Sequence, residues 1–506
     1  MRGPGEIIGL SLDNNVPTQP IPPPTPAPFL TLFPSIMLPM FIGIMDQTIV
    51  ATALPAIAAS LGDISLIAWV VAGYLIANAI AAPVYGRLGD AFGRRRMMVI
   101  ALTVAFVGSA LCALSASIEM LIAARFLQGL GGGGLISLSQ ALIGQSVVPR
   151  DRARYQGYIA TVAVSASTIG PVVGGLLTQY ISWRAIFVLN LPILALAMAL
   201  VFRLPARTTP FERFRFDFPG LLLLAMFVSS FLIFVKQTQN LETLNVPLAT
   251  GLLGAAIVSI VLLYFREKHA STPLLPLPLL GKPTMWRCNL LVIIYGGLFV
   301  SLISFLPLYL STVRGASAAE IGLLMLPLTA GVGLGSTLIG QIVGRTGRTM
   351  IFPMIGLGIG TPMMVFLALA GGSLSTIQLS WYLAILAFFL GFVMTVVQVT
   401  VHAEAGKMLG TAAAAVQLSR SVGAATGTAI IGAVLFAAIA ATGTEISNDL
   451  QSILQGSVEA LANLGPGVEA TIRANVATAF SSVFLTIAGF GLVAILVTWS
   501  IPRRSI

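Results

Sequence analysis

Long apolar runs separated by short polar stretches cover the chain from residue 29 almost to its end. A helix needs ~20 mostly apolar residues to cross the hydrocarbon core of a membrane, whereas a strand of a membrane barrel needs ~10 residues that alternate in polarity. The runs are of helical length and do not alternate, so the sequence predicts about fourteen membrane-spanning helices. Their approximate cores are 29–59, 66–85, 97–115, 120–143, 155–178, 185–202, 219–235, 248–265, 290–310, 321–342, 351–369, 381–401, 416–440 and 477–499.

The composition supports a membrane protein and argues against a soluble one. Of the 506 residues, 57% are hydrophobic and only 9% are charged, and the mean hydropathy is +0.96. A soluble chain of this length would need far more polar surface. The two cysteines, Cys112 and Cys288, lie in or beside apolar runs and indicate neither a disulfide framework nor a metal site. The predicted fold class is therefore an all-α polytopic membrane protein.

The net charge of +10 comes from basic residues that gather on one side of the predicted membrane. With the N-terminus inside, the loops after even-numbered helices and the C-terminal tail hold Arg87, Arg94, Arg95, Arg96, Arg150, Arg152, Arg154, Arg203, Arg207, Arg213, Arg215, Arg266, Lys268, Lys282, Arg287, Arg345, Arg348, Lys407, Arg503 and Arg504. The opposite loops hold only Arg184, Lys236, Arg314 and Arg473. Because cytoplasmic loops collect Lys and Arg, this bias predicts that both termini are cytoplasmic, and no nucleic-acid partner is needed to explain the charge.

Three segments lie outside the predicted helices and their short loops. Residues 1–28 are polar and proline-rich and lack the pattern of a signal peptide, so we interpret them as a flexible cytoplasmic tail. Residues 442–471 form the longest predicted extracellular loop, either a solvated connector or a short hairpin or helix over the outer mouth. Residues 501–506 form a short cytoplasmic tail.

Two glycine-rich patterns each occur twice, which indicates an internal repeat. GRLGDAFGRRR follows the predicted second helix, and its spacing returns in GQIVGRTGRT, where Gly344 stands in the place of Asp90. STIGPVVGGLL in the fifth helix is echoed by SVGAATGTAIIG in the thirteenth. The first pattern is defined by Gly86, Asp90, Gly93, Arg94 and Arg95. The repeat predicts two six-helix halves, 29–203 and 288–500, with two extra helices in the linker 204–287.

Five motifs in order resemble one family of transporters. They are MDQTIVATALP from residue 45, GRLGDAFGRRR from 86, RFLQG from 125, GPVVGG from 170 and WRAIFVLNLP from 183. With them the chain resembles, over nearly its whole length, the fourteen-helix drug:proton antiporters of the major facilitator superfamily. The resemblance implies the major facilitator fold, in which two six-helix bundles rock about a site at the membrane midplane.

Asp46 is an acidic residue deep within the first predicted helix, where a charge costs ~2.5–3.5 kcal/mol on insertion scales. A carboxyl that gains and loses a proton is what proton coupling requires, and the alternative is a structural hydrogen bond to a neighbouring helix. Arg125 lies at nearly the same depth, so we predict a direct or water-mediated ion pair, extended by Gln128 one turn away. The alternative is that Arg125 has only a structural role, in which its side chain extends to the membrane surface or donates hydrogen bonds to backbone carbonyls. The resemblance makes Asp46 a proton or substrate site.

Other polar side chains within the predicted helices are candidates for a central cavity, namely Tyr74, Asn78, Tyr295, Ser304 and Gln398. The resemblance places helices one, four, nine and twelve around that cavity. The GPVVGG motif contributes Gly170, Pro171, Gly174 and Gly175. Because proline bends a helix and small residues allow close approach, we interpret this motif as a conformational element, which the resemblance places at the interface between the halves.

Asp90 is not explained by topology, because acidic residues contribute little to membrane orientation. We hypothesise that Asp90, with Arg94 and Arg95, latches the end of the second helix to a neighbour across the two halves. Such a latch would stabilise the outward-facing state and would be one-sided, since the second copy has Gly344 at this position.

The sequence contains no pattern of an enzyme, because it has no Walker loop and its glycine run 131–134 lies within an apolar helix. The resemblance implies an exporter of the bacterial inner membrane that exchanges inward-moving protons for an outward-moving hydrophobic or amphiphilic compound. The proton would be the coupling ion, and no cofactor is expected. Exporters of cationic compounds in the family that the chain resembles often carry several embedded acids, whereas helices ten and thirteen here have none. This departure argues against multivalent cationic substrates and leaves a neutral, a zwitterionic and an anionic amphiphile as equal alternatives. The open alternatives are an exporter of a specific lipid or metabolite, a proton symporter, and a membrane sensor that does not transport. A periplasmic adaptor is not indicated.

Overall fold

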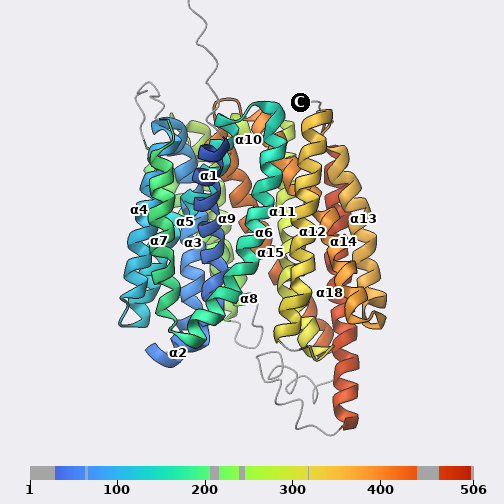
Figure 1. Cartoon of the computed structure of the whole chain (residues 1–506). Coiled ribbons are helices and arrows are strands. Elements are labelled where there is room, and N and C mark those ends of the chain that lie inside the picture. The colour runs from blue at the N-terminus through green and yellow to red at the C-terminus, as the bar shows by residue number, and fades with distance from the viewer. Residues whose placement is uncertain are drawn as a thin grey trace, which may run out of the picture.

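The chain is a helical bundle in the computed structural model, which describes residues 29–62, 66–205, 216–238, 245–316, 318–441 and 466–502. Within these residues, fourteen helical segments are long and apolar enough to cross a membrane, and no strand is present. The predicted fold class and helix number are thus confirmed. Figure 1 shows the helices running side by side, with the first half of the chain in blue and green and the second half in yellow and red.

Most helices are longer than their predicted apolar cores, whereas the first predicted helix, 29–59, is divided into α1, η1 and α2. The bounds are α1 (Phe29–Ile49), η1 (Val50–Ala53), α2 (Leu54–Leu61), α3 (Ile67–Phe92), α4 (Arg94–Ala113), α5 (Ile118–Ser146), α6 (Pro149–Tyr180), α7 (Arg184–Phe202), α8 (Phe218–Thr238), α9 (Val246–His269), α10 (Leu277–Leu280), α11 (Pro283–Thr312), α12 (Ala318–Thr346), α13 (Ile351–Ala370), η3 (Gly371–Ser373), α14 (Thr376–Glu404), α15 (Leu409–Ala440) and α18 (Pro466–Ser500). Hydropathy detects only the part of a helix that lies in hydrocarbon, whereas backbone hydrogen bonding carries the helix further into the polar surface layer.

The largest difference from the prediction is at the last helix. We expected a loop as far as residue 471, but α18 already begins at Pro466, so residues 466–471 are helical. The rest of that predicted loop, residues 442–465, lies outside the described residues, as do the N-terminal tail 1–28 and residues 503–506.

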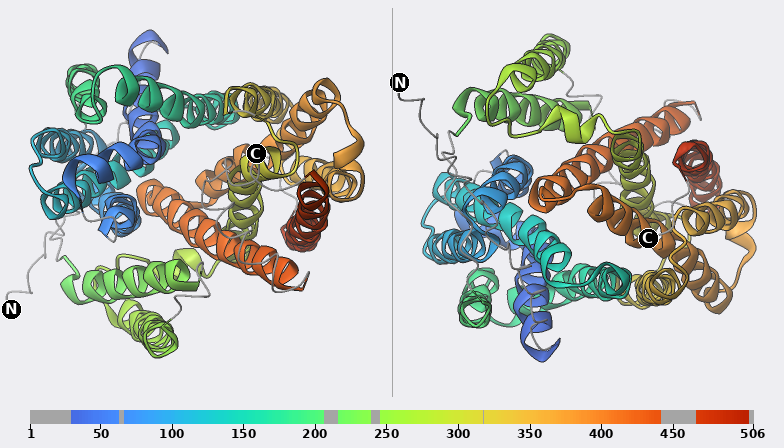
Figure 2. Two further views of the ribbon diagram at one scale, coloured as in Figure 1. Left: turned by 90° about the horizontal axis from the view of Figure 1, so that it is seen from below. Right: turned by 90° about the horizontal axis from the view of Figure 1, so that it is seen from above.

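Buried hydrophobic side chains form two large clusters, one in each half of the chain. One cluster draws on residues from α1 to α7, and the other draws mainly on residues from α11 to α18. The inserted helices α8 and α9 form a smaller cluster with α3, in which Leu224 and Leu263 pack with Ile76. Figure 2 shows α8 and α9 as a separate pair at the edge of the bundle, beside α3 and α15.

The two halves approach each other closely along two pairs of helices. A Cβ added to Gly86 of α3 would lie 2.6 Å from the carbonyl oxygen of Gly410 in α15, and one added to Gly157 of α6 would lie 2.7 Å from that of Ser336 in α12. Thr161 of α6 also lies 3.0 Å from Thr337 of α12, hydroxyl to hydroxyl. Glycine is therefore required at Gly86 and Gly157 for backbones of different halves to touch.

The repeated sequence pattern has a matching structure in both halves. Gly93 follows α3 with a φ of 94°, and Gly347 follows α12 with a φ of 69°, so both copies turn through a conformation that favours glycine. One turn or more before these residues, Gly86 approaches α15 and Gly340 approaches Ala153 of α6. Each copy therefore places a glycine of one half against a helix of the other.

Candidate functional site

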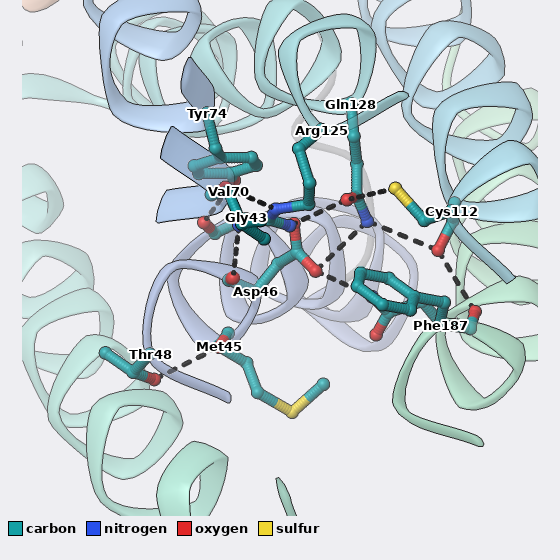
Figure 3. Close-up of polar contacts among 12 residues, drawn as sticks. Gly43, Met45, Asp46, Thr48, Val70, Tyr74, Cys112, Arg125, Gln128 and Phe187 are labelled. Atoms are coloured by element: carbon teal, nitrogen blue, oxygen red, sulfur yellow. Dashed lines mark hydrogen bonds and ion pairs between the residues drawn. The ribbon is translucent and has the colours of Figure 1, made fainter. Parts of the chain in front are cut away.

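Asp46 lies at the centre of a buried polar network inside the first half of the chain (Figure 3). Its Oδ2 atom accepts a hydrogen bond of 2.9 Å from Nη1 of Arg125. Its Oδ1 atom accepts from Nε2 of Gln128 at 3.1 Å and from Nδ2 of Asn190 at 2.8 Å. Asp46 is only 3% exposed, so these three donors replace the water that a free carboxylate would hold.

Arg125 of α5 is fully buried and is the cationic partner of Asp46. Besides the carboxylate, its guanidinium donates to the backbone oxygen of Asp46 at 3.3 Å, to that of Val70 at 3.3 Å and to Oε1 of Gln128 at 2.7 Å. The ring centroid of Tyr74 lies 4.1 Å from its Cζ atom, which is a cation–π contact. Arg125 thereby joins α1, α3 and α5, and removing either charge would leave the other buried without a counter-charge.

The network extends to α4 and α7. Gln128 Nε2 donates to the hydroxyl of Ser109 at 3.2 Å, and this hydroxyl donates to the carbonyl of Phe187 at 3.0 Å. Asn190 of α7, 1% exposed, was not singled out from the sequence as a site residue. The feature of the sequence that could have identified Asn190 is a polar amide in the middle of the apolar helix Arg184–Phe202. Such a group must find a partner within the bundle, and here that partner is Asp46.

Small residues let the helices that carry this network pack closely. A Cβ on Gly129 of α5 would meet the carbonyl oxygen of Tyr74 in α3, and one on Gly133 would meet that of Asn78. On α1, a Cβ on Gly43 would lie 3.3 Å from the side chains of Leu135 and Ile136. The glycine run of α5 is therefore a packing surface for its neighbours.

The first spanning segment changes geometry just after Asp46. The four residues of η1 form a 3₁₀ turn between α1 and α2, a feature that often marks a hinge. Gly174 of the GPVVGG motif packs here, where an added Cβ would lie 2.6 Å from the hydroxyl of Thr52, and Gly170 packs against Thr48. The motif thus contacts α1 of its own half, whereas α6 reaches the other half nearer its beginning, through Gly157 and Thr161. The helix α6 therefore lies at the interface between the halves, as expected, while the contacts of Gly170 and Gly174 themselves are with the first spanning segment.

The cavity candidates lie in different surroundings. The Tyr74 hydroxyl donates to the Gly43 carbonyl at 3.3 Å, and the Tyr295 hydroxyl donates to the Leu390 carbonyl at 2.9 Å. Asn78 and Gln398 are buried, and Nδ2 of the first and Oε1 of the second have no hydrogen-bond partner among the described residues. Ser304 is exposed. Tyr74 thus belongs to the Asp46 network, while Tyr295 joins two helices of the second half.

Asp90, at the end of α3, receives donors from the other half of the chain. Its two carboxylate oxygens accept from the backbone nitrogens of Gly410 and Thr411 at 2.9 and 2.8 Å and from the Thr411 hydroxyl at 2.9 Å. Arg94 completes the site with an ion pair of 2.7 Å. Asp90 thus caps the first turn of α15, which has no acidic residue of its own, whereas α6 carries Asp151 in its own first turn. This difference accounts for an acid in only one copy of the repeat.

Of the two arginines predicted to join this latch, only Arg94 pairs with Asp90, whereas Arg95 binds within its own half. Arg95 donates to the carbonyl of Phe202 at the end of α7 at 2.7 Å, and Gly93 forms the turn that brings Arg94 back toward α3. The sequence therefore identified the relevant acid, and the structure supplies its partners 320 and 321 residues away.

Sequence analysis missed two further groups of charged residues. Arg420 lies within α15 and was not recognised as an embedded charge. Asp217 and Glu267 are buried near the ends of α8 and α9, and Asp217 pairs with Arg266 at 2.9 Å. In each case the signal was a charged residue at the edge of, or inside, a long apolar run.

Comparison with known proteins gives a consistent result. Residues 36–428 match the family model described as Major Facilitator Superfamily. The chain is 33% identical over 404 residues to an uncharacterized MFS-type transporter of Mycobacterium tuberculosis, an alignment that covers 79% of this chain but 59% of that protein. It is 30% identical to the multidrug transporter protein MdtP of Bacillus subtilis, over 80% of this chain and 75% of that protein. Among solved structures, the human organic anion transporter MFSD10 has the same fold, with a TM-score of 0.62, 16% identity, and coverage of 93% of this chain and 100% of that one.

Proposed function

The chain belongs to the major facilitator superfamily, and we propose that it is a proton-coupled antiporter that exports hydrophobic or amphiphilic compounds by alternating access. The observation that carries the proposal is the buried Asp46 carboxylate with donors from Arg125, Gln128 and Asn190. Relatives named as multidrug transporters, including MdtP, support export of small compounds and argue for a transporter, not an enzyme. The same proposal places the protein in the bacterial inner membrane, with the proton as coupling ion and no cofactor.

Protonation of Asp46 would change the packing of α1. The neutral carboxyl no longer balances the charge of Arg125, and the proton takes the place of one of the donors that hold α1 against α5 and α7. Because η1 follows within four residues, the loosened segment is next to a hinge. Gly170 and Gly174 of α6 pack on this same stretch, and α6 contacts α12 of the other half. A continuous set of contacts thus leads from the proton site to the interface between the halves.

In the proposed transport cycle, the contact of Asp90 with α15 acts as a latch at the end of the bundle where α3 ends and α15 begins. While Asp90 caps α15, the ends of α3 and α15 are held together, and this end of the transporter is closed. Opening this end requires the carboxylate to give up three donors of the other half and to regain water.

Asp90→Asn is expected to lower transport turnover about tenfold or more while the protein still inserts in the membrane. The variant loses the charge that stabilises the first turn of α15, and hydrogen bonds to a charged group are worth about 1.5–3 kcal/mol. Turnover per inserted molecule is the measurement, and Asp151→Asn, which removes an exposed acid from the first turn of α6, is the control. If Asp90→Asn instead prevents insertion, the stretch acts as a topology signal and the latch is wrong.

The proposed function is tested by proton movement in reconstituted vesicles. When a transported compound is added to vesicles that hold an imposed pH gradient, an antiporter collapses the gradient as the compound moves against the protons. We expect this dissipation to depend on the compound and to saturate with its concentration. Protons and compound moving in the same direction would establish a symporter, and compound movement without proton movement would rule out proton coupling.

A further inference from the structure

Arg420 is a charged residue near the middle of a membrane-spanning helix. It lies eleven residues after Leu409, the first residue of α15, which places it ~17 Å along the helix axis. Its backbone is level with Gly296, the fourteenth residue of the 30-residue helix α11, because a Cβ on Gly296 would lie 2.9 Å from the Arg420 carbonyl oxygen. A cation at this depth is costly unless it faces the interior of the bundle and meets an anion or water.

The guanidinium of Arg420 has no partner in the part of the chain that the structure describes. It makes no hydrogen bond, ion pair or ring contact with any described residue, and its side chain is partly exposed. Arg125 provides the contrast, since that side chain is fully buried and bound to four acceptor groups. Arg420 is therefore not a pin that holds helices together in this state.

The packing of α15 shows where Arg420 points. Gly410 faces α3 of the first half, and Gly423 faces α11 of the second half, where an added Cβ would meet the backbone of Ile293. With ~100° per residue, Arg420 lies roughly 80° from Gly410 and roughly 60° from Gly423 in the opposite sense. The side chain therefore leaves α15 in the sector between α3 and α11, toward the boundary of the two halves.

The surroundings of Arg420 along α15 are polar. Gln417 lies one turn before Arg420 in the same sector, and on the adjoining side of α15 Ser419 donates a 3.1 Å hydrogen bond to Asn289 of α11. These neutral groups can accept or donate hydrogen bonds to a bound molecule, but they cannot balance a positive charge.

No described carboxylate is available to neutralise Arg420. Asp46 is already paired with Arg125 and two amides. The other described acids of the spanning segments lie in or beside the first or last turns of their helices, and they are Asp90, Glu119, Asp151, Asp217, Glu267, Glu320 and Glu404. The middle of the described bundle thus carries one positive charge without a counter-ion.

We propose that Arg420 binds the anionic group of the exported compound, so that the preferred substrates are amphiphiles that carry a carboxylate, sulfonate or phosphate. Guanidinium groups form paired, charge-assisted hydrogen bonds with such anions, and the low-polarity surroundings strengthen them. The apolar part of the molecule would lie among the hydrophobic side chains of the bundle. This inference rests on the proposed export function and specifies its substrate class.

The test compares two probes that differ in one charged group. These are 8-anilinonaphthalene-1-sulfonate, which is an anion, and N-phenyl-1-naphthylamine, which has the same ring system without the sulfonate. Their efflux rates are measured in reconstituted vesicles with a pH gradient, and the readout is the ratio of the anion rate to the neutral rate. A defect in folding or insertion lowers both rates and cancels in this ratio.

We expect the wild type to prefer the anion, Arg420→Gln to lower the ratio about tenfold or more, and Arg420→Lys to retain part of the preference. Arg345→Gln removes an exposed arginine in the last turn of α12 and should leave the ratio unchanged. An unchanged ratio in Arg420→Gln, or equal loss of both rates, overturns the inference. If the wild type exports the neutral probe but not the anion, only this inference fails. If the pH gradient drives neither these two probes nor the compounds used to test antiport, the proposed export function fails.

Discussion

Replacement of Asp46 by asparagine is expected to abolish efflux driven by a pH gradient, while exchange of substrate at equal pH on both sides remains measurable. Asparagine has nearly the same shape as aspartate but cannot gain or lose a proton, so it removes the proposed coupling site with little change in side-chain volume. The pH-driven rate should fall to the rate seen without a gradient. Efflux and exchange are measured in the same reconstituted vesicles.

The Asp46→Asn result needs a control for stability, because the variant leaves Arg125 buried without a counter-charge. Breaking a buried ion pair by removing one partner costs about 3–5 kcal/mol. The double variant Asp46→Asn/Arg125→Gln removes both charges and should recover much of the lost stability without recovering coupling. Glu320→Gln, an exposed acid in the first turn of α12, should leave efflux unchanged. Efflux at the wild-type rate in Asp46→Asn would show that this carboxyl is not the coupling group.

Replacement of Arg125 by glutamine is expected to cause a loss of stability at least as large as that of Asp46→Asn, because it breaks the same buried ion pair. The side chain is fully buried, and its removal leaves the Asp46 carboxylate without its cation and the carbonyl of Val70 without its donor. The expected cost is about 3–5 kcal/mol, observed as a lower Tm of the purified protein and as less protein in the membrane.

Two further variants separate charge from shape at Arg125. Arg125→Lys keeps the positive charge but has a compact ammonium in place of the planar fork, so it should satisfy Asp46 and lose the contacts to Val70 and Gln128. Its Tm should lie between those of the wild type and Arg125→Gln. Arg203→Gln, which removes an exposed arginine just after α7, should have no effect. A wild-type Tm in Arg125→Gln would mean that the buried pair contributes no net stability.

Depth along a helix was enough to suggest the pairing of Asp46 with Arg125. Both residues lie well inside apolar runs, and the cost of a single buried charge favours a partner at the same level. Depth alone could not identify Asn190, because a neutral amide carries a weaker penalty, and the motif WRAIFVLNLP that contains it does not show which helix the amide faces. Depth also could not show that Arg125 is paired whereas Arg420 has no counter-ion among the described residues. This difference depends on which side chains surround each arginine.

The GPVVGG motif shows a second limit of sequence reasoning. Small residues at Gly170 and Gly174 correctly indicate that another helix comes close. The identity of that helix depends on how α6 is rotated about its axis and on which neighbours surround it. The structure places α1 there, so the motif borders the segment that carries Asp46, and the contact with α12 is made elsewhere on α6.

The sequence by itself determined the fourteen spans, and it pointed to the repeated pattern and to Asp46 and Asp90 as candidate residues. These depend on local quantities, namely the transfer of apolar residues into hydrocarbon, which adds along each run, and the penalty of a charge at a given depth. Only the tertiary structure decided which donors meet those carboxylates: Asn190 for Asp46, and the first turn of α15 for Asp90. The reason is that hydrogen bonds and ion pairs act over about 3 Å, so they depend on the rotation and neighbours of each helix, which hydropathy does not encode.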